Sequence, residues 1–412
     1  MNPWPIILAD LRSLRWIAWA VPLVVAIAVA IGIAVSAQDQ ALRTASARAA
    51  DDFDLVIGAP GSQTQLVLTT VYLQPDAIGL ADGALLNRLA NDKRVAAAAP
   101  IAFGDVVHGY PVVGTTTSFV SRWGRLQPAE GRTFAAENEA VIGASVALQL
   151  GATVTPSHGM AHHGSLGAED TEEYAHRHEE AQYRIVGRLP RQNSPWDWAI
   201  LVPIESVWEI HGLGNGHAVD EAPLGPPFDA KTVPGVPAIL VKPKSVADAY
   251  VLRGEYRKNG TMALFPAEVL VAIYQTLGDV KLAMVVVSGF NNALVLVATV
   301  ALLLTMVGLR QRRYAVLRAL GAPRRYVLLA VWLGTAGLLT AGCVLGLGLS
   351  LLASWVAGSV IEARTGLHLA VTLGWSELAF FALIILCGSG MALIPALFVY
   401  RRPVSPNLRS SA

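Results

Sequence analysis

Five of the nine histidines of this 412-residue chain fall between positions 158 and 178. Six carboxylate side chains lie within the same polar stretch when it is extended to residue 180. Imidazole nitrogens and carboxylate oxygens are common ligands of zinc and other divalent transition metals. The pattern predicts a divalent metal site, with Zn²⁺ as the first candidate, built from the five histidines of this stretch: His158, His162, His163, His176 and His178.

The spacing of these histidines leaves a second interpretation open. His176 and His178 would lie on one face of a strand, whereas Glu172 and His176 would lie together on a helix. No fixed ligand spacing selects one of the two. The alternative is therefore a solvated acidic loop that binds metal weakly through its composition alone.

Arginines form a second cluster, in the sequence RQRRYAVLRALGAPRR at positions 310–325. It holds six arginines and no acid, and apolar segments flank it on both sides. A short arginine-rich connection between two spans is typical of a cytoplasmic loop. Arginine can also contact anionic lipids, so the charges alone do not indicate a binding partner.

The elements that would position both clusters are apolar. Hydrophobic residues make up 53% of the chain and charged residues only 15%, a balance that indicates a membrane protein. Four segments exceed the ~20 residues needed to cross a bilayer, at 16–36, 283–309, 327–356 and 378–400. Arg12, Arg15 and the sequence Val35-Ser36-Ala37 would also fit a cleaved signal peptide. The first apolar run is longer than such peptides carry, which favours an uncleaved anchor.

Charge predicts the orientation. Residues 1–15, 310–326 and 401–412 together hold eleven arginines and one acid, Asp10. Residues 37–282 hold 19 Lys and Arg against 27 Asp and Glu. The arginine bias predicts cytoplasmic termini, a cytoplasmic loop at 310–326 and a long outside segment. The net charge of +1 gives no indication of a nucleic-acid partner.

The predicted fold is an α-helical membrane protein with four transmembrane helices and a large α+β extracytoplasmic domain inserted between the first and second. An amphipathic helix at 1–15 precedes the first span, whose helix continues as a stalk to about residue 52. The outside domain covers 53–265, with a His- and acid-rich insertion at 156–182, and a second stalk joins the span within 266–309. Strands are predicted at 53–57, 65–74, 112–114, 183–189, 199–202 and 238–241, and helices at 84–93, 145–150, 204–211 and 245–257.

This order of elements resembles the MacB/FtsX/LolC-type permeases of ABC transporters. The sequence AVLRALGAPRR looks like the "ILRAIGAS" motif of that family. Four outside segments are also similar to such permeases: FDLVIGAPGSQTQLVLTTVY, GDVVHGYPVVGTT, EAVIGASVALQLG and YRIVGRL. The resemblance implies a bacterial inner-membrane permease subunit that pairs with a second permease chain, expected to be identical, and with a cytoplasmic ABC ATPase. A periplasmic or outer-membrane partner is a further expectation.

The implied mechanism is mechanotransmission, in which a separate ATPase moves the cytoplasmic loop and the stalks carry the motion outward. A short coupling helix would end at Gly321, and Pro323 would prevent its continuation. The residues expected to contact the ATPase are Val316, Leu317, Arg318, Leu320, Gly321 and Ala322. The family often has a glutamate five residues before the position of Arg318, where this chain has Arg313.

The sequence contains no Walker-type phosphate loop and no nucleophile elbow. ATP is therefore expected to be bound by the partner, and we predict neither an enzyme active site nor a cofactor in this chain other than Zn²⁺. Two alternatives stay open. One is an FtsX-like signal transducer that controls a periplasmic partner such as a cell-wall hydrolase. The other is a membrane-anchored metal receptor without an ATPase.

Overall fold

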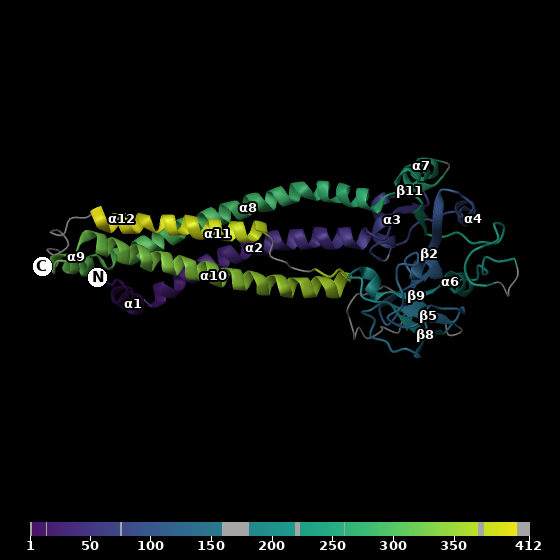
Figure 1. Cartoon of the computed structure of the whole chain (residues 1–412), viewed down its shortest axis with the longest axis horizontal. Helices are drawn as coiled ribbons and strands as arrows, with labels where there is room; N and C mark the ends of the chain where they lie inside the picture. Colours follow the sequence, from purple (N-terminus) through teal and green to yellow (C-terminus); the bar gives the residue numbers. More distant parts are fainter. Residues whose placement is uncertain are drawn as a thin grey trace. The chain divides into compact units, whose positions relative to one another are not determined.

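The computed structural model describes residues 2–13, 15–74, 76–158, 181–218, 223–258, 260–369 and 375–401. They form two compact units (Figure 1). The helical unit comprises Met1–Ala41, Gly278–Gly358 and Ala370–Ala412. The sheet unit comprises Leu42–Leu277 and Ser359–Leu369.

The helical unit is built mainly of long apolar helices. Its elements, some of which continue into the sheet unit, are α1 (Trp4–Ser13), α2 (Arg15–Ala50), α8 (Pro266–Gly308), α9 (Gln311–Ala319), α10 (Arg324–Thr365), α11 (Trp375–Met391) and α12 (Leu393–Arg401). Within the described residues, two segments are long and apolar enough to cross a membrane, Ala18–Ala50 and Arg324–Ala363. Two shorter apolar segments are Leu296–Gly308 and Phe381–Leu397. Four complete spans therefore stay a prediction.

The last apolar segment is not one continuous helix. The helix α11 ends at Met391, and α12 begins at Leu393. Pro395 explains the break, because its ring clashes with the carbonyl of the residue four positions earlier, which is Met391. The third apolar helix also differs from expectation. The helix α10 runs to Thr365, beyond the predicted end at Val356.

Small residues allow α10 to pack closely on α2. A Cβ at Gly342 would lie 2.9 Å from the Pro22 carbonyl oxygen and 2.7 Å from Val25 Cβ. A Cβ at Gly346 would lie 2.7 Å from the Ala26 carbonyl oxygen. Glycine pairs at this spacing let the backbones of membrane helices approach each other.

The sheet unit is organised around one mixed sheet with the strand order β11-β1-β10-β2-β3-β9-β5-β8-β4; β6 pairs with β8 and β7 with β2. Its strands are β1 (Leu55–Gly58), β2 (Val95–Val107), β3 (Tyr110–Thr115), β4 (Glu130–Gly131), β5 (Glu139–Ile142), β6 (Thr153–Val154), β7 (Ser157–His158), β8 (Tyr183–Arg188), β9 (Ile200–Pro203), β10 (Ala238–Pro243) and β11 (Met262–Leu264). Its helices are α3 (Gln63–Thr70), α4 (Ala84–Ala90), α5 (Thr117–Val120), η1 (Pro195–Trp198), α6 (Ile204–Ile210) and α7 (Val246–Tyr256).

Alternate residues of the strands supply two hydrophobic cores, one on each face of the sheet. In β1, Leu55 and Ile57 belong to one core and Val56 belongs to the other. The strand β2 joins the two halves of the sheet, because its first part pairs with β10 and its second part with β3. The pairing register of β2 shifts between Phe103 and Asp105, where Gly104 has a φ of +153°.

Two local predictions in this unit were wrong. Residues 65–74, predicted as a strand, lie largely in the helix α3, whose N-cap Ser62 accepts a hydrogen bond from the Gln65 amide. Residues 145–150, predicted as a helix, contain none. The long β2 was missed because its run of alanines has low strand propensity.

Candidate functional site

The arginine-rich loop forms the short helix α9 followed by a tight reversal. Gly321 has a φ of +97°. The Ala322 amide donates to the Leu317 carbonyl over 3.0 Å, and the Gly321 amide donates to the Arg318 carbonyl over 3.1 Å. This pair of hydrogen bonds is the Schellman arrangement that ends a helix at a left-handed glycine. The predicted cap at Gly321 is therefore present, and α10 begins directly after Pro323.

The predicted apolar face of α9 divides into an inward and an outward part. Leu317 and Ala322 pack on a small buried cluster centred on Tyr314 and Val327. Val316 and Leu320 remain 42% and 80% exposed. They are four residues apart and so lie on one side of the helix. The large apolar side chains that this loop exposes to a partner are therefore Val316 and Leu320, whereas Leu317 is half-buried.

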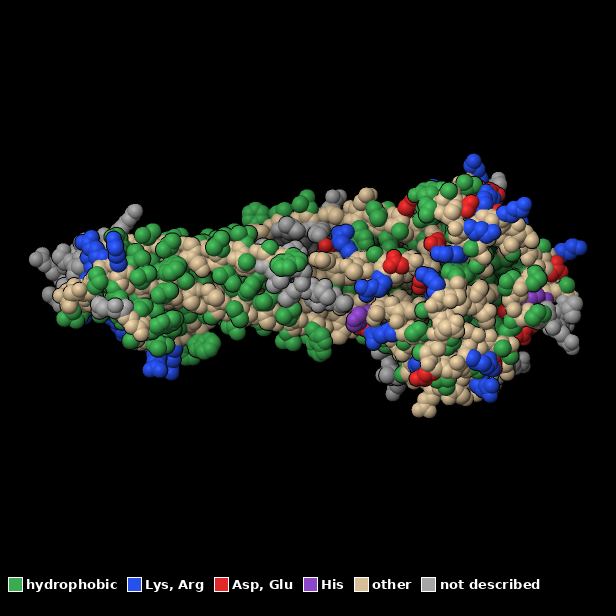
Figure 2. Space-filling model, viewed as in Figure 1, with side chains coloured by type: hydrophobic (Ala, Val, Ile, Leu, Met, Phe, Trp, Pro, Cys, Tyr) green, Lys and Arg blue, Asp and Glu red, His purple; other side chains and the backbone are tan. Residues whose placement is uncertain are grey.

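Basic residues flank Val316 and Leu320 along the chain, at positions 312, 313, 318, 324 and 325. On the face seen in Figure 2, hydrophobic side chains cover most of the helical unit, and Lys and Arg side chains gather at one end. Figure 1 places α1 and α9 at that end. The predicted contact residue Arg318 is half-buried on the last turn of α9. An exposed valine and an exposed leucine, with arginines near them in the chain, would fit an apolar groove with an acidic rim on a partner.

A buried ion pair fastens α1 to the start of this loop. Asp10 of α1 is 9% exposed and Arg310 is 3% exposed. Arg310 Nη1 lies 3.1 Å from Asp10 Oδ2, and another Arg310 nitrogen donates to the Asp10 carbonyl. The Tyr314 hydroxyl donates to the same carboxylate over 3.0 Å. We call Asp10, Arg310 and Tyr314 the α1 clamp.

The clamp also gives Arg313 a role. Arg313 Nη1 donates to the Ser13 hydroxyl over 3.0 Å and lies 3.8 Å from Asp10 Oδ1. The arginine at the position where the family often has glutamate therefore complements an acid on α1 of the same chain. Burial, with the nearby Asp10 carboxylate as a second cause, raises the pKa of Tyr314, so this phenol stays protonated and can donate.

Sequence reasoning missed Asp10 as a functional residue, although one signal was present. Asp10 is the single acid among the three arginine-rich segments at 1–15, 310–326 and 401–412. A lone carboxylate on a short apolar helix requires a partner once it is buried. Nothing in the sequence identifies that partner as Arg310, because the two residues are 300 positions apart.

In the sheet unit, one segment receives the C-terminal end of α10. Arg191 Nη2 lies 2.5 Å from Glu362 Oε1, and His368 Nδ1 lies 2.8 Å from Glu362 Oε2. A Cβ at Gly366, whose φ is +68°, would lie 3.0 Å from Pro195 Cα. The residues that follow the predicted third span are thus bonded to the segment 191–198 of the sheet unit.

The same segment also packs beside the end of α2. The rings of Trp196 and Phe53 have centroids 5.8 Å apart, and Phe53 lies three residues after Ala50, where α2 ends. The Trp196 indole donates to the Val71 carbonyl over 3.1 Å. Segment 191–198 is therefore a junction that contacts the C-terminal end of α10 and the residues directly after α2.

A buried arginine braces this junction. Arg122 Nε lies 3.4 Å from Asp52 Oδ2, and the guanidinium stacks 4.1 Å above the centre of the Phe119 ring. Burial lowers the pKa of Arg122 to about 10, with Asp52 acting in the opposite direction. The guanidinium is therefore still charged at neutral pH, and the charge is paired as burial requires.

The histidine stretch falls mostly outside the described residues. His162, His163, His176 and His178 all lie in the undescribed range 159–180. His158 is in β7, where it pairs with Asp105 of β2. The part of the chain that the structure describes contains no group of three or more His, Cys, Asp or Glu side chains placed to hold a metal. The metal site stays a prediction about the insertion itself.

Two parts of the chain match known protein families. Residues 19–257 match the model of the MacB-like periplasmic core domain, and residues 285–404 match that of the FtsX-like permease C-terminal region. The chain belongs to the FtsX/MacB-like permease family. The resemblance given by the Arg310–Arg325 loop and the outside segments is thereby confirmed. FtsX/MacB-like permeases are membrane-embedded and work with ABC ATPase partners.

Two solved structures are similar to part of this permease. The periplasmic region of MacB from Actinobacillus actinomycetemcomitans is 12% identical, with a TM-score of 0.32, over 55% of this chain and 95% of that one. The extracellular domain of the noncanonic ABC-type transporter YknZ from Gram-positive bacteria is 14% identical, with a TM-score of 0.28, over 51% of this chain and 98% of that one. A comparison with curated protein sequences finds no significant match.

Proposed function

We propose that this chain is the membrane subunit of a mechanotransmission ABC transporter. A separate cytoplasmic ATPase docks on Val316 and Leu320 of α9, and closure of the ATPase moves α9 together with α1. The observation that supports this proposal most is the α1 clamp. A short exposed loop would deform when pushed, whereas α9 is held to α1 by the buried Asp10–Arg310 pair.

Three long helices offer a route for this motion to the outside domain. The helices α2, α8 and α10 each contribute residues to both the helical unit and the sheet unit. A continuous helix transmits displacement along its axis because its backbone hydrogen bonds are internal. The end of α10 and Phe53, three residues after α2, contact segment 191–198, which would receive the motion.

This proposal assigns a topology and a set of partners. Both termini and the α9 loop face the cytoplasm of a bacterial inner membrane, four helices span it, and the sheet unit lies in the periplasm. Two identical permease chains form the membrane part, and the sheet unit handles a substrate or partner protein on the outer side. The FtsX-like signal transducer is the second candidate, and the molecules bound by the sheet unit would distinguish the two.

Co-purification of the ATPase from native membranes tests the docking surface. We expect Leu320→Asp to reduce the amount of ABC ATPase that purifies with the full chain by about tenfold, since loss of a central apolar contact costs at least about 1.4 kcal/mol. The matched control is Leu213→Asp, which changes an exposed leucine of the sheet unit. Equal recovery of the ATPase with both variants would contradict docking at α9.

We further propose that the histidine insertion binds Zn²⁺. The support is compositional: five histidines and six carboxylates within 158–180. The full chain in nanodiscs should bind Zn²⁺ with sub-micromolar affinity. Alanine at His162, His163, His176 and His178 should remove this binding, while His211→Ala, outside the insertion, should preserve it. An affinity equal to that of a generic histidine-rich peptide would refute a dedicated site.

A further inference from the structure

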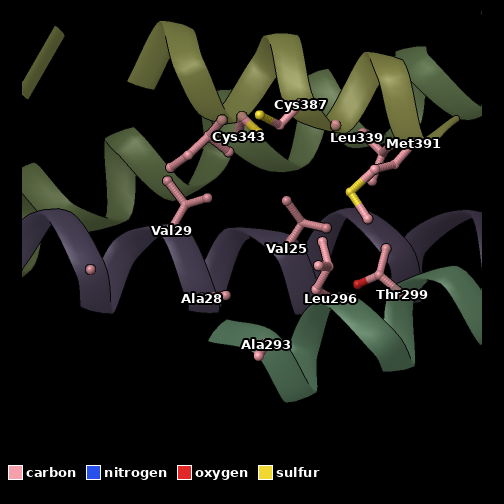
Figure 3. A pocket seen from close by; sticks show the side chains of 13 residues that line it. Val25, Ala28, Val29, Ala293, Leu296, Thr299, Leu339, Cys343, Cys387 and Met391 are labelled. Atoms are coloured by element: carbon pink, nitrogen blue, oxygen red, sulfur yellow. The ribbon is translucent and has the colours of Figure 1, made fainter. Parts of the chain in front are cut away.

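The helical unit contains a partly open apolar cavity that the proposed mechanism does not use. Its volume is about 360 Å³, and residues of α2, α8, α10 and α11 line it. In Figure 3, Cys343 of α10 and Cys387 of α11 lie across the cavity from Ala293 and Leu296 of α8. An engineered cavity of roughly 150 Å³ already holds benzene. By that proportion, this cavity accommodates about 14 non-hydrogen atoms.

One polar group in this lining lacks a partner. Thr299 is 5% exposed, and its hydroxyl oxygen has no hydrogen-bond partner among the described residues. Figure 3 shows this oxygen turned toward Leu296, another lining residue. A threonine inside a helix ordinarily bonds back to a carbonyl one turn earlier. Thr305 on the same helix does so, with its hydroxyl donating to Ala301 over 2.9 Å.

The position of Thr299 keeps water from satisfying this unpaired hydroxyl. It lies ten residues before Leu309, where the predicted second span ends, which corresponds to about 15 Å along a helix. That depth is about the middle of a bilayer, where water does not supply the missing bond. A buried hydroxyl without a bond is costly, so a ligand that provides an acceptor would be favoured.

The geometry points to a binding site for a neutral, mainly apolar molecule that carries one hydrogen-bond acceptor, such as a ketone or ester carbonyl. The apolar part fills the cavity, and the Thr299 hydroxyl donates to the acceptor. None of the lining side chains carries a formal charge, so a charged ligand would be buried without compensation. A lipid tail without an acceptor would fill the space but leave Thr299 without a bond.

The two cysteines of the chain both line this cavity, and Cys387 is the exposed one. Its modification by methyl methanethiosulfonate therefore reports occupancy without an engineered label. The probe is dodecan-2-one, and dodecane is the matched molecule without an acceptor. With the full chain in nanodiscs, each compound is titrated and the rate of Cys387 modification is followed by mass spectrometry.

We expect dodecan-2-one to protect Cys387 saturably, with an apparent affinity about fivefold higher than that of dodecane. This ratio corresponds to the net free energy that one hydrogen bond contributes. Thr299→Val keeps the shape but removes the hydroxyl, and should abolish this preference. Thr305→Val should leave it unchanged, and Ala28→Phe, which fills the cavity, should remove protection by both compounds. Equal protection by ketone and hydrocarbon in the native chain, or a preference that survives Thr299→Val, would overturn the proposal.

Discussion

At the scale of single residues, the α1 clamp shows how a buried charge can specify an arrangement. Asp10, Arg310 and Tyr314 are all nearly inaccessible to solvent, and each bonds to another member of the group. Removal of Asp10 or Arg310 alone leaves its charged partner buried without compensation, which is more costly than loss of the pair as a whole. The clamp therefore holds α1 in one position against the start of the loop.

Replacement of Asp10 tests this role. Asp10→Asn should destabilise the helical unit by about 3 kcal/mol, because Arg310 remains buried without its counter-charge. It should also lower ATP hydrolysis by the complex. The stability is measured by thermal unfolding of the full chain in detergent. Asp51→Asn, at an exposed position directly after α2, serves as the control, and equal stability of the two variants would show that the clamp is dispensable.

A second residue-scale prediction concerns pH. Burial, followed by repulsion from Glu209, raises the pKa of Glu137 to about 7. A carboxyl whose folded-state pKa is raised binds its proton more tightly when folded, so stability falls as pH rises from about 4.5 to about 7. Thermal unfolding between pH 4.5 and 8 should show this loss, and Glu137→Gln should reduce it. An unchanged pH profile in the variant would argue against the assignment.

At the scale of elements, the sequence predicts structure correctly where the contacts that decide it are local. The end of α9 at Gly321 follows from a glycine and a proline placed side by side, which need no distant contact. The error at α3 has the opposite origin. Its valine and threonines favour a strand, but the Ser62 cap and packing against the sheet core select a helix.

The long α10 was only partly predictable. Polar and charged residues after Val356 end the hydropathic signal but do not end the helix. The contacts of Glu362 with Arg191 and His368 fasten the last turn of α10, and they join positions far apart in sequence. The clamp partner of Asp10 was unpredictable for the same reason.

The packing of α10 on α2 gives an element-scale prediction. Gly346→Leu should destabilise the helical unit by about 1–3 kcal/mol, since its Cβ would overlap the Ala26 carbonyl and Val29. Gly348→Leu is the matched control, because a Cβ there meets nothing within 4 Å. Thermal unfolding compares the two, and equal effects would show that the helices do not pack as described.

At the scale of the whole molecule, the family assignment and the junction support one account. The chain carries a MacB-like periplasmic core domain and an FtsX-like permease region. Continuous helices contribute to both units, and two of them end beside segment 191–198. We therefore predict that nucleotide binding to the ATPase changes the environment of this segment, although no substrate has to cross the membrane.

Hydrogen exchange of segment 191–198 measures that coupling directly. With the full permease and its ATPase in nanodiscs, addition of a non-hydrolysable ATP analogue should change the exchange rate of these amides. Leu320→Asp should abolish the change, whereas Leu213→Asp should preserve it. A segment that exchanges at the same rate with and without nucleotide, in a complex that still binds the ATPase, would contradict mechanotransmission through this chain.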